Sequence, residues 1–427
     1  MMILLCVLLY ILLPSTVFIL FLLDLPFFGV LDTINYLFSI FSYFFILNHI
    51  LITTKLPWLQ RWIPYDKIVK FHVISGTFII TAIYSHGAYK ILIGKYIDLL
   101  TWILLGLFTI LYLLSILWIE APGVRRFRSF LLKRLHKEHL ASYDKLKLLH
   151  GYLFVLLAIG AFLHIREAGV IDGSFTFNRL VPLIYPILVI GLFLYSKFRK
   201  VFLPKLVLTS SEQYQGTTIL TFTEIQPGNR ITYRSGQFGY LRWVGKDTTK
   251  EEHPFSFLSS PSAGHVSLAI KDLGDYTQGI KDIPLGSIAK INGGFGNFIP
   301  DYTKGKVCLI GSGIGIVPIL SLLQDLKEHQ SQQKILCFLA VNSREELLIE
   351  DILQRISNEF ENLSLNIQIF EEDHILFSRN YFEQKISTPL DYNYYLCSSP
   401  GVRGILMEAF SEMGIQSRQI HFEAFSF

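Results

Sequence analysis

The sequence predicts a multi-domain membrane protein with three parts: a six-helix transmembrane bundle over residues 1–200, an antiparallel β-barrel over 201–302, and an α/β nucleotide-binding domain over 303–427. A length of 427 residues allows two or three domains. The chain is 51% hydrophobic, yet its long apolar runs lie in the first half and its charged residues are concentrated in the second. Short alternating strand patterns follow the apolar half, and mixed strand and helix patterns follow these.

Six apolar stretches in the first half are each long enough to cross the hydrocarbon core of a bilayer, which takes about 20 residues of helix. The first stretch is too long, and too closely followed by the others, to be only a cleaved signal peptide. We therefore expect six membrane-spanning helices. The stretches cover residues 3–23, 30–52, 68–93, 97–118, 146–165 and 179–196.

Lys and Arg are distributed unevenly over the connecting segments. Sixteen of them lie in segments 53–70, 119–147 and 197–205, and four lie in the alternate loops. Because positively charged loops stay in the cytoplasm, we expect both termini and the second half of the chain there. The basic segment 122–145 has an amphipathic pattern, which predicts contact with anionic headgroups; a docking surface for the second half is the alternative.

Four histidines lie in these apolar runs at one repeated spacing. His72 and His86 are 14 residues apart, and so are His150 and His164. On a helix, 14 residues return a side chain to within roughly 40° of its starting direction and separate the two side chains by ~21 Å. Both helices run outward, so we expect His72 to face His150 near the inner membrane surface and His86 to face His164 near the outer surface.

Two facing imidazoles are suitable axial ligands for haem iron, and a haem ligated on both faces favours electron transfer. The repeated spacing therefore predicts two b-type haems, one above the other. The alternative for any single buried histidine is a polar group satisfied by a neighbouring helix, and we interpret His49, which has no partner at this spacing, as an interfacial or satisfied histidine. Buried ionisable groups are costly in a membrane and usually functional, which favours ligation for the two pairs.

The second half of the chain changes to short strands with Gly-rich and Pro-rich turns. The first group predicts a small antiparallel barrel, and the later group, which alternates with helices, predicts a parallel α/β layout. Barrel strands are expected at 205–210, 217–223 and 265–271, and parallel strands at 306–311, 334–341, 365–370, 394–397 and 419–425.

A glycine-rich turn stands where the first parallel strand meets its helix. It runs Gly311-Ser312-Gly313-Ile314-Gly315-Ile316-Val317-Pro318. Glycines let the backbone approach a pyrophosphate, whose charge is favoured at a helix N-terminus. A tight turn without a ligand is the alternative, but the position between a strand and a helix favours a nucleotide site.

Several short motifs occur in one order along the second half. They are His253-Pro254-Phe255-Ser256, Ile270-Lys271-Asp272-Leu273-Gly274-Asp275-Tyr276-Thr277, the Gly311 to Pro318 turn, Cys397-Ser398-Ser399-Pro400 and Glu423-Ala424-Phe425. Together with the histidine pairs, they make the chain resemble the ferric reductase and NADPH oxidase superfamily, whose C-terminal half resembles ferredoxin-NADP reductase. The resemblance runs from about residue 67 to the end.

The resemblance implies roles for the matched positions of the barrel. The stretch from His253 through Pro254 and Phe255 would line the flavin of FAD, and Ser256 would hydrogen-bond its isoalloxazine ring. Lys271 and Thr277, with Gly274 between them, would hold the FAD pyrophosphate.

The resemblance also implies roles for positions at the nucleotide end. Gly311, Gly313, Gly315 and Pro318 would form the dinucleotide turn, Cys397 with Pro400 would lie near the nicotinamide, and Glu423 belongs to the catalytic set. Phe425 would cover the flavin face until nicotinamide displaces it. Ser398 stands where the family usually has Gly, which departs from the family turn, and Phe427 could take the stacking role, since residues two apart on a strand share a face.

The implied activity is electron transfer from cytoplasmic NAD(P)H through FAD and two haems b to an acceptor on the opposite side. Reduction of O2 to superoxide is the first expectation, and reduction of a ferric chelate is the alternative. A cytochrome and flavin module that passes electrons to a partner protein is a further reading, whereas a transporter with a histidine relay would need no flavin half. Ser343 and Arg344 follow the second parallel strand, so we expect them to bind a 2′-phosphate and to favour NADPH, with NADH possible.

Two cations are expected at the level of the outer haem. Lys90 lies one turn beyond His86, and Arg166 lies two residues beyond His164. A positive charge there would stabilise superoxide as it forms and attract anionic chelates; the alternative is snorkelling toward headgroups. The sequence contains no EF-hand loop and no Pro-rich partner-binding run, so we expect neither an obligatory protein activator nor a nucleic-acid partner.

Overall fold

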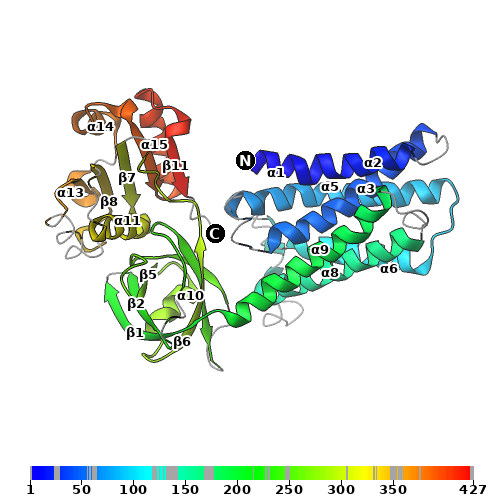
Figure 1. The fold of residues 1–427 in the computed structure, drawn as a ribbon, viewed down its shortest axis with the longest axis horizontal. Coiled ribbons are helices and arrows are strands. Elements are labelled where there is room, and N and C mark those ends of the chain that lie inside the picture. Colours follow the sequence, from blue (N-terminus) through cyan, green and yellow to red (C-terminus); the bar gives the residue numbers. More distant parts are fainter. Residues whose placement is uncertain are drawn as a thin grey trace. The chain divides into compact units, whose positions relative to one another are not determined.

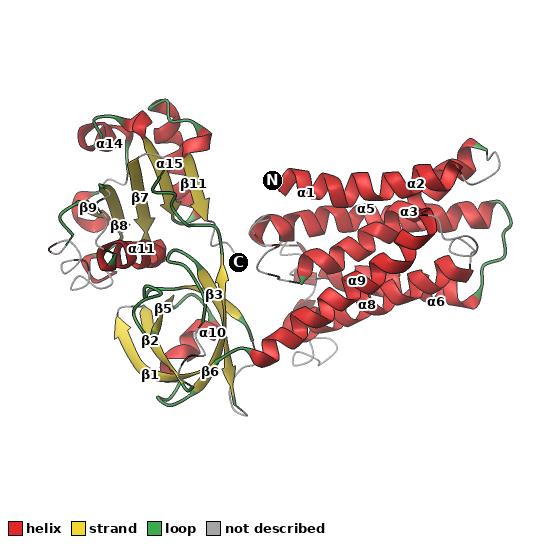
Figure 2. Cartoon of the chain, in the orientation of Figure 1, coloured by secondary structure: helices red, strands yellow, loops and turns green. Residues whose placement is uncertain are grey.

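The chain divides into two compact units, Met1–Val201 and Phe202–Phe427, each with its own hydrophobic cores. The first is helical and the second combines strands with helices (Figures 1 and 2). The computed structural model describes residues 2–23, 29–54, 56, 59, 65–117, 123–124, 126–127, 129–130, 143–167, 177–214, 216–226, 228, 231–245, 251–303, 306–329, 332, 334–346, 353, 358, 360–374 and 377–423.

Long helices running alongside one another make up the first unit (Figure 1). Among the described residues, five segments are long and apolar enough to cross a membrane: Ile3–Leu23, Val30–Thr53, Leu99–Ile116, Leu148–Glu167 and Arg179–Phe202. The elements are α1 (Met2–Val7), the π segment η1 (Leu8–Leu12), α2 (Leu13–Leu23), α3 (Val30–Thr53), α5 (Tyr65–Leu92), α6 (Leu99–Leu117), α8 (Tyr143–Glu167), α9 (Phe177–Arg199) and η3 (Lys200–Phe202).

The predicted count of six spans is met in part. The sixth candidate is α5, whose 28 residues give a helix about 42 Å long. It is not among the five segments found within the described residues, so the sixth span stays a prediction.

Helix α3 is the centre of the first unit, because α5, α8, α9 and the first helical segments all pack against it. It carries buried polar residues that tie these helices together. In the π turn of η1, the carbonyl of Leu9 would accept a hydrogen bond from the N–H of residue 14, five positions further along the chain. Residue 14 is a proline, which has no N–H. Asn48 Nδ2 supplies the missing donor, 2.7 Å from the Leu9 carbonyl oxygen.

An antiparallel six-stranded sheet opens the second unit, with the order β4-β3-β6-β1-β2-β5. Its strands are β1 (Lys205–Tyr214), β2 (Thr217–Glu224), β3 (Phe238–Val244), β4 (His253–Ser256), β5 (Val266–Lys271) and β6 (Ile288–Phe295). The short helices α10 (Asp275–Gln278) and η4 (Gly279–Asp282) lie between β5 and β6. The antiparallel prediction is confirmed. A closed barrel is not confirmed, because β4 and β5 are the two edge strands of the sheet, and among the described residues only an isolated bridge from Phe257 to Leu268 and a hydrogen bond from Leu258 N–H to the Ser267 carbonyl link the segment just after β4 to β5.

The second sheet is parallel throughout, with the order β11-β10-β7-β8-β9. Its strands are β7 (Lys306–Ser312), β8 (Ile335–Val341), β9 (Leu363–Ile369), β10 (Tyr392–Cys397) and β11 (Ile420–Glu423). The intervening helical segments are η5 (Gly313–Gly315), α11 (Ile316–Glu328), η6 (Arg344–Glu346), α13 (Phe370–Asp373), α14 (Arg379–Lys385), η7 (Pro389–Asp391), α15 (Pro400–Glu412) and η8 (Ser417–Gln419). The strand order reverses between β7 and β10, and ligands of such sheets bind beyond the carboxyl ends of the strands at this point.

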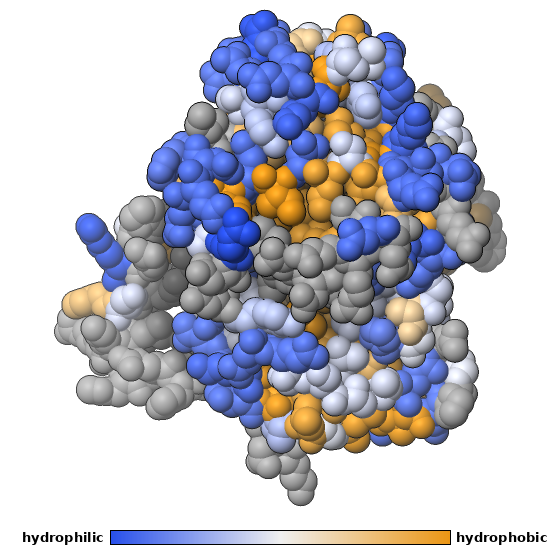
Figure 3. All heavy atoms as spheres, turned by 90° about the vertical axis from the view of Figure 1, so that its left-hand side faces the viewer, coloured by the Kyte–Doolittle hydropathy of each residue, from blue (hydrophilic) through white to orange (hydrophobic). Residues whose placement is uncertain are grey.

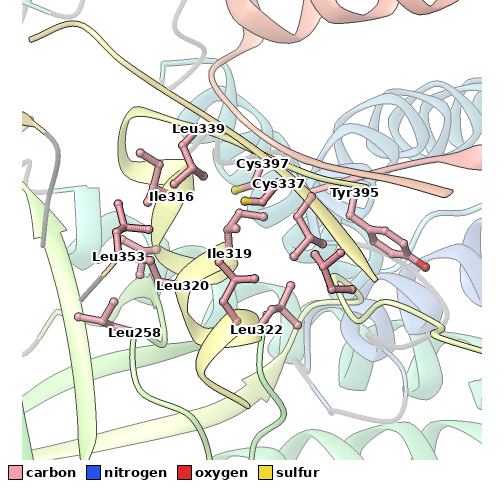
Figure 4. Packing of buried hydrophobic residues seen from close by; sticks show 14 of the residues in the cluster. Leu258, Ile316, Ile319, Leu320, Leu322, Cys337, Leu339, Leu353, Tyr395 and Cys397 are labelled. Atoms are coloured by element: carbon pink, nitrogen blue, oxygen red, sulfur yellow. The ribbon is translucent and has the colours of Figure 1, made fainter. Parts of the chain in front are cut away.

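The two sheets share one hydrophobic core. Leu258 from the antiparallel part packs in the same cluster as Ile316 and Leu320 of α11 (Figure 4). A hydrogen bond of 2.9 Å from Ser321 Oγ to the Ser259 carbonyl adds a polar link. The antiparallel and parallel sheets therefore form one packed body. In the view of Figure 3, hydrophobic side chains gather between hydrophilic ones among the coloured residues.

Candidate functional site

The structure brings the four spaced histidines together in two pairs between α5 and α8. The ring centroids of His72 and His150 are 6.1 Å apart, and those of His86 and His164 are 6.4 Å apart. An imidazole nitrogen binds a metal ion at about 2.0–2.1 Å, so two imidazoles on opposite faces of one ion place their ring centroids about 6 Å apart. Both pairs therefore have the spacing of a two-ligand metal site.

The Nδ1 atoms of the two α8 histidines have hydroxyl partners, which leaves their Nε2 atoms available for a metal ion. Nδ1 of His150 lies 3.2 Å from Ser115 Oγ, and Nδ1 of His164 lies 3.1 Å from Thr101 Oγ1. The Nδ1 atoms of His72 and His86 are buried and have no hydrogen-bond partner among the described residues. Within the same part of the chain, no three His, Cys, Asp or Glu side chains cluster as a larger metal site would require.

The sequence analysis missed Thr101 and Ser115, although a signal was present. They too are 14 residues apart, on α6, and α6 packs against α8. His49, which lacked a partner at the repeated spacing, is buried with 1% exposure. Its Nδ1 lies 2.8 Å from the Phe45 carbonyl and its Nε2 lies 3.0 Å from Ser75 Oγ, so it is a satisfied histidine rather than an interfacial one.

The two predicted outer cations differ in their surroundings. Lys90, in the last turn of α5, is half-buried and its Nζ lies 5.6 Å from the centroid of the Tyr36 ring. Arg166, near the end of α8, is exposed. Lys90 is therefore held against α3 by a cation–π contact, while the side chain of Arg166 is open to its surroundings.

The predicted flavin-lining stretch forms the edge strand β4. A proline is tolerated there because one side of an edge strand has no ladder to supply with hydrogen bonds, and Pro254 pairs with Tyr240 of β3. The ring of His253 stacks on Tyr276 at 3.7 Å, and that of Phe255 lies parallel to the same ring at 6.4 Å. Ser256, opposite Phe238 of β3, is buried.

Both residues assigned to the FAD pyrophosphate have protein partners. Lys271 Nζ forms an ion pair of 3.2 Å with Glu346 Oε1 of η6, which ties the antiparallel sheet to the parallel one. Thr277 Oγ1 accepts the N–H groups of Leu273 and Gly274 at 2.9 and 3.0 Å. Thr277 thus shapes the turn before α10, and Gly274 is part of the same turn.

At the strand-order reversal, the glycine-rich turn meets the end of β10. A Cβ atom at Gly315 would lie 2.0 Å from the carbonyl oxygen of Cys397, so only glycine allows this approach. Gly313 has a φ of +54°, and Gly311, the last residue but one of β7, pairs with Cys397 in the β7–β10 register. Pro318 is buried in the first turn of α11, where its missing N–H costs no helical hydrogen bond.

Cys397 and Glu423 are neighbours across β10 and β11. Burial, and after it the charge of Glu423, raises the pKa of the Cys397 thiol well above its ordinary value. Next along the chain, Ser398 is buried and its Oγ has no hydrogen-bond partner within the described residues. Ser399 caps α15 by accepting the N–H of Val402, and Pro400 opens that helix. Phe425 and Phe427 lie outside the described residues.

The predicted 2′-phosphate residues follow β8, with Arg344 in η6. The guanidinium group of Arg344 forms a bidentate ion pair with Glu372: Nε lies 3.0 Å from Glu372 Oε1 and Nη2 lies 2.9 Å from Glu372 Oε2. The Ser343 carbonyl accepts the N–H of Glu346 at 3.1 Å. A 2′-phosphate would have to compete with Glu372 for this fork.

Two family models match parts of the second unit. A family model described as an FAD-binding domain matches residues 207–336, and one described as an oxidoreductase NAD-binding domain matches residues 309–386. Dual oxidase 1 of Canis lupus familiaris is 27% identical over 304 residues, which are 63% of this chain and 18% of that protein. Respiratory burst oxidase homolog protein F of Arabidopsis thaliana is 33% identical over 136 residues, 24% of this chain and 14% of that one.

Other similar proteins cover between about a third and two thirds of this chain. The sulfhydrogenase 2 subunit gamma of Pyrococcus furiosus is 28% identical over 155 residues, 36% of this chain and 52% of its own length. Among solved structures, the flavohemoglobin of Malassezia yamatoensis is 17% identical with a TM-score of 0.49, covering 64% of this chain and 74% of that one. The chain thus spans from less than a fifth to about half of the curated relatives named here.

The two domain matches and the oxidase relatives support assignment of the chain to a ferric reductase and NADPH oxidase-like superfamily, with a C-terminal half like that of ferredoxin-NADP reductase. Its second unit carries the FAD-binding and NAD-binding domains of an oxidoreductase, and its first unit has several helices apolar enough for a membrane.

Proposed function

We propose that this chain is a transmembrane oxidoreductase that transfers electrons from cytoplasmic NAD(P)H through FAD and two b-type haems to O2 on the opposite side, forming superoxide. The observation that carries the proposal is the pair of facing histidine pairs, with ring centroids 6.1 and 6.4 Å apart. FAD, when bound, takes an electron pair from nicotinamide and releases single electrons, which haem iron can carry. No side chain serves this purpose across ~30 Å of hydrocarbon.

The donor set supports two haems rather than another metal group. His72 with His150 would hold the inner haem, and His86 with His164 would hold the outer haem. Each pair supplies two imidazoles, and the hydrogen bonds at Nδ1 of the α8 histidines leave their Nε2 atoms for a metal. A porphyrin provides the four further ligands that the described residues around these pairs do not.

At the nucleotide end, the chain's own residues would bind and orient the cofactors. The close approach of Gly315 to Cys397 brings the dinucleotide turn against the end of β10, where the nicotinamide would lie. Cys397 would contact the nicotinamide as a neutral thiol, and Glu423 beside it would supply a carboxylate at the same edge. His253, Phe255 and Ser256 would border the flavin, while Lys271 would exchange Glu346 for the FAD pyrophosphate.

The unequal distribution of Lys and Arg over the loops supports cytoplasmic termini and a cytoplasmic second unit. Electrons would then leave on the outer side, at the level of His86 and His164. The exposed Arg166 and half-buried Lys90 also favour a second candidate acceptor, an anionic ferric chelate, because cations attract it. No protein activator is required by this proposal.

The test is an assay of the purified full-length chain in lipid vesicles, loaded with FAD and haem. NADPH should drive superoxide formation, measured as cytochrome c reduction that superoxide dismutase inhibits. Reduction of ferric citrate without superoxide would select the ferric reductase instead, and activity that appears only after a lysate fraction is added would indicate a required partner. An absorption spectrum without the α-band of a bis-histidine b-type haem would refute the proposal.

A further inference from the structure

Two hydroxyl side chains of α6 stand behind the histidines of α8. Ser115 Oγ lies 3.2 Å from His150 Nδ1, and Thr101 Oγ1 lies 3.1 Å from His164 Nδ1. The two hydroxyl residues are separated by the same 14 positions as the two histidines, so the contact is repeated at both levels of the bundle. Neither α5 histidine has such a partner at Nδ1 among the described residues.

In both contacts the hydroxyl has already used its single hydrogen. Ser115 Oγ donates to the Leu111 carbonyl at 2.7 Å, and Thr101 Oγ1 donates to Asp98 Oδ2 at 2.9 Å. A hydroxyl group has one hydrogen to give but two lone pairs to accept with. Toward the imidazole it can therefore only accept, which requires the hydrogen of each neutral ring to be on Nδ1 and leaves Nε2 bare.

We propose that Thr101 and Ser115 are positioning residues that hold His164 and His150 in the Nδ1–H tautomer and turn each bare Nε2 toward haem iron. This inference rests on the proposed function, because it assigns iron to the histidine pairs. Hydrogen bonds behind a ligating histidine set its ring orientation and its basicity. Thr101 and Ser115 thereby select the ligating nitrogen before haem binds.

The two levels differ in the group that accepts the hydrogen bond donated by the hydroxyl. At the inner level the acceptor is the neutral carbonyl of Leu111, whereas at the outer level it is the carboxyl group of Asp98. Asp98 also accepts the backbone N–H of Thr101 at 2.7 Å, and accepting two hydrogen bonds favours the ionised form of its carboxyl group.

A negative charge at the end of the His164–Thr101–Asp98 chain makes His164 a stronger electron donor to iron. Such donation stabilises the ferric over the ferrous state. The outer haem is therefore held at a lower reduction potential than it would have with a neutral group at position 98, which increases its driving force for reducing the acceptor.

The experiment compares haem content and the two midpoint potentials in the full-length chain, with His164→Ala and His150→Ala used to assign each potential to a level. In Thr101→Val, the affinity for the outer haem should fall by about 10-fold or more and its midpoint potential should rise, while the inner haem is unchanged. Thr101→Ser keeps the hydroxyl and should restore both values. Ser115→Ala should produce the matching loss of affinity at the inner level alone.

Asp98→Asn removes the charge and one of the two acceptor oxygens. Asparagine caps a helix as well as aspartate does, so α6 should keep its start, but its NH2 group cannot accept from Thr101 Oγ1. The outer haem should therefore bind more weakly and with a raised potential. Potentials that stay unchanged in Thr101→Val and Asp98→Asn, in a wild type that contains two haems, would overturn this inference and leave the proposed function standing. A wild type that contains no haem on these histidines would overturn the proposed function itself.

Discussion

Cys397 and Glu423 lie directly opposite each other on adjacent parallel strands, at the carboxyl ends of β10 and β11. The backbone of Gly315 approaches the same point so closely that its missing side chain is required. Three segments that are distant in the sequence therefore meet where the strand order reverses. This meeting point carries the thiol, the carboxylate and the glycine turn of the proposed nicotinamide site.

The first prediction concerns the inner histidine pair. Replacing His72 or His150 with Ala removes one axial ligand, so the inner haem should be lost and the haem content per chain should fall by half. Reduction of FAD by NADPH should continue, since the second unit has its own cores. Pyridine haemochrome assays give the haem content and anaerobic stopped-flow absorbance follows the flavin. Unchanged haem content in both variants would contradict the ligand assignment.

The second prediction concerns the choice between NADPH and NADH. Removing the competing carboxylate in Glu372→Gln should free the Arg344 fork and raise kcat/KM for NADPH by about 10-fold, in line with a charge-assisted hydrogen bond. Arg344→Ala should lower the same constant by a similar factor and leave NADH unaffected. Equal use of both nucleotides by the wild type and both variants would exclude these residues from the 2′-phosphate site.

The third prediction tests the close approach at the glycine turn. Gly315→Ala forces a Cβ into the Cys397 carbonyl, and such overpacking costs about 1–3 kcal/mol. We expect a lower midpoint of thermal unfolding and a raised KM for NADPH. The matched control is Gly404→Ala in α15, where a Cβ would meet nothing within 4 Å. If both variants unfold at the wild-type temperature, the turn is not as tight as described.

The fourth prediction follows from the raised pKa of the Cys397 thiol. A folded-state pKa above the unfolded value means that the stabilising effect of the neutral thiol is present below the ordinary pKa of 9.0 and is lost as pH rises toward the folded value. Cys397 should therefore resist iodoacetamide in the native protein at pH 8 and react only after unfolding. Mass spectrometry of the labelled peptides checks this, and rapid native labelling would contradict it.

The fifth prediction concerns the outer cations. Replacing Lys90 and Arg166 with Ala together should slow reoxidation of the outer haem by the acceptor about tenfold, because local positive charge attracts and stabilises anions. Haem content and NADPH-to-FAD transfer should be unchanged. Lys95→Ala is the control for the loss of one exposed charge nearby. Wild-type reoxidation rates in the double variant would leave Lys90 and Arg166 as membrane anchors only.

The positions of the helices and strands could be read from the sequence, because apolar length and periodicity are local properties. The stretch expected at 97–118 is α6, Leu99–Leu117, and the strand expected at 217–223 is β2, Thr217–Glu224. The repeated spacing of His72, His86, His150 and His164 also predicted which histidines face each other, since 14 residues return to one side of a helix.

Only the tertiary structure decided what each of these side chains touches. Thr101 meets His164 across 63 positions and Ser115 meets His150 across 35, and such contacts depend on how each helix is rotated against its neighbour. The same holds for Glu372, which enters the Arg344 fork from another segment. A hydrogen bond requires its two atoms to approach within a few tenths of an ångström of one distance; periodicity determines which face of a helix a residue occupies, and packing alone determines which atoms on that face meet.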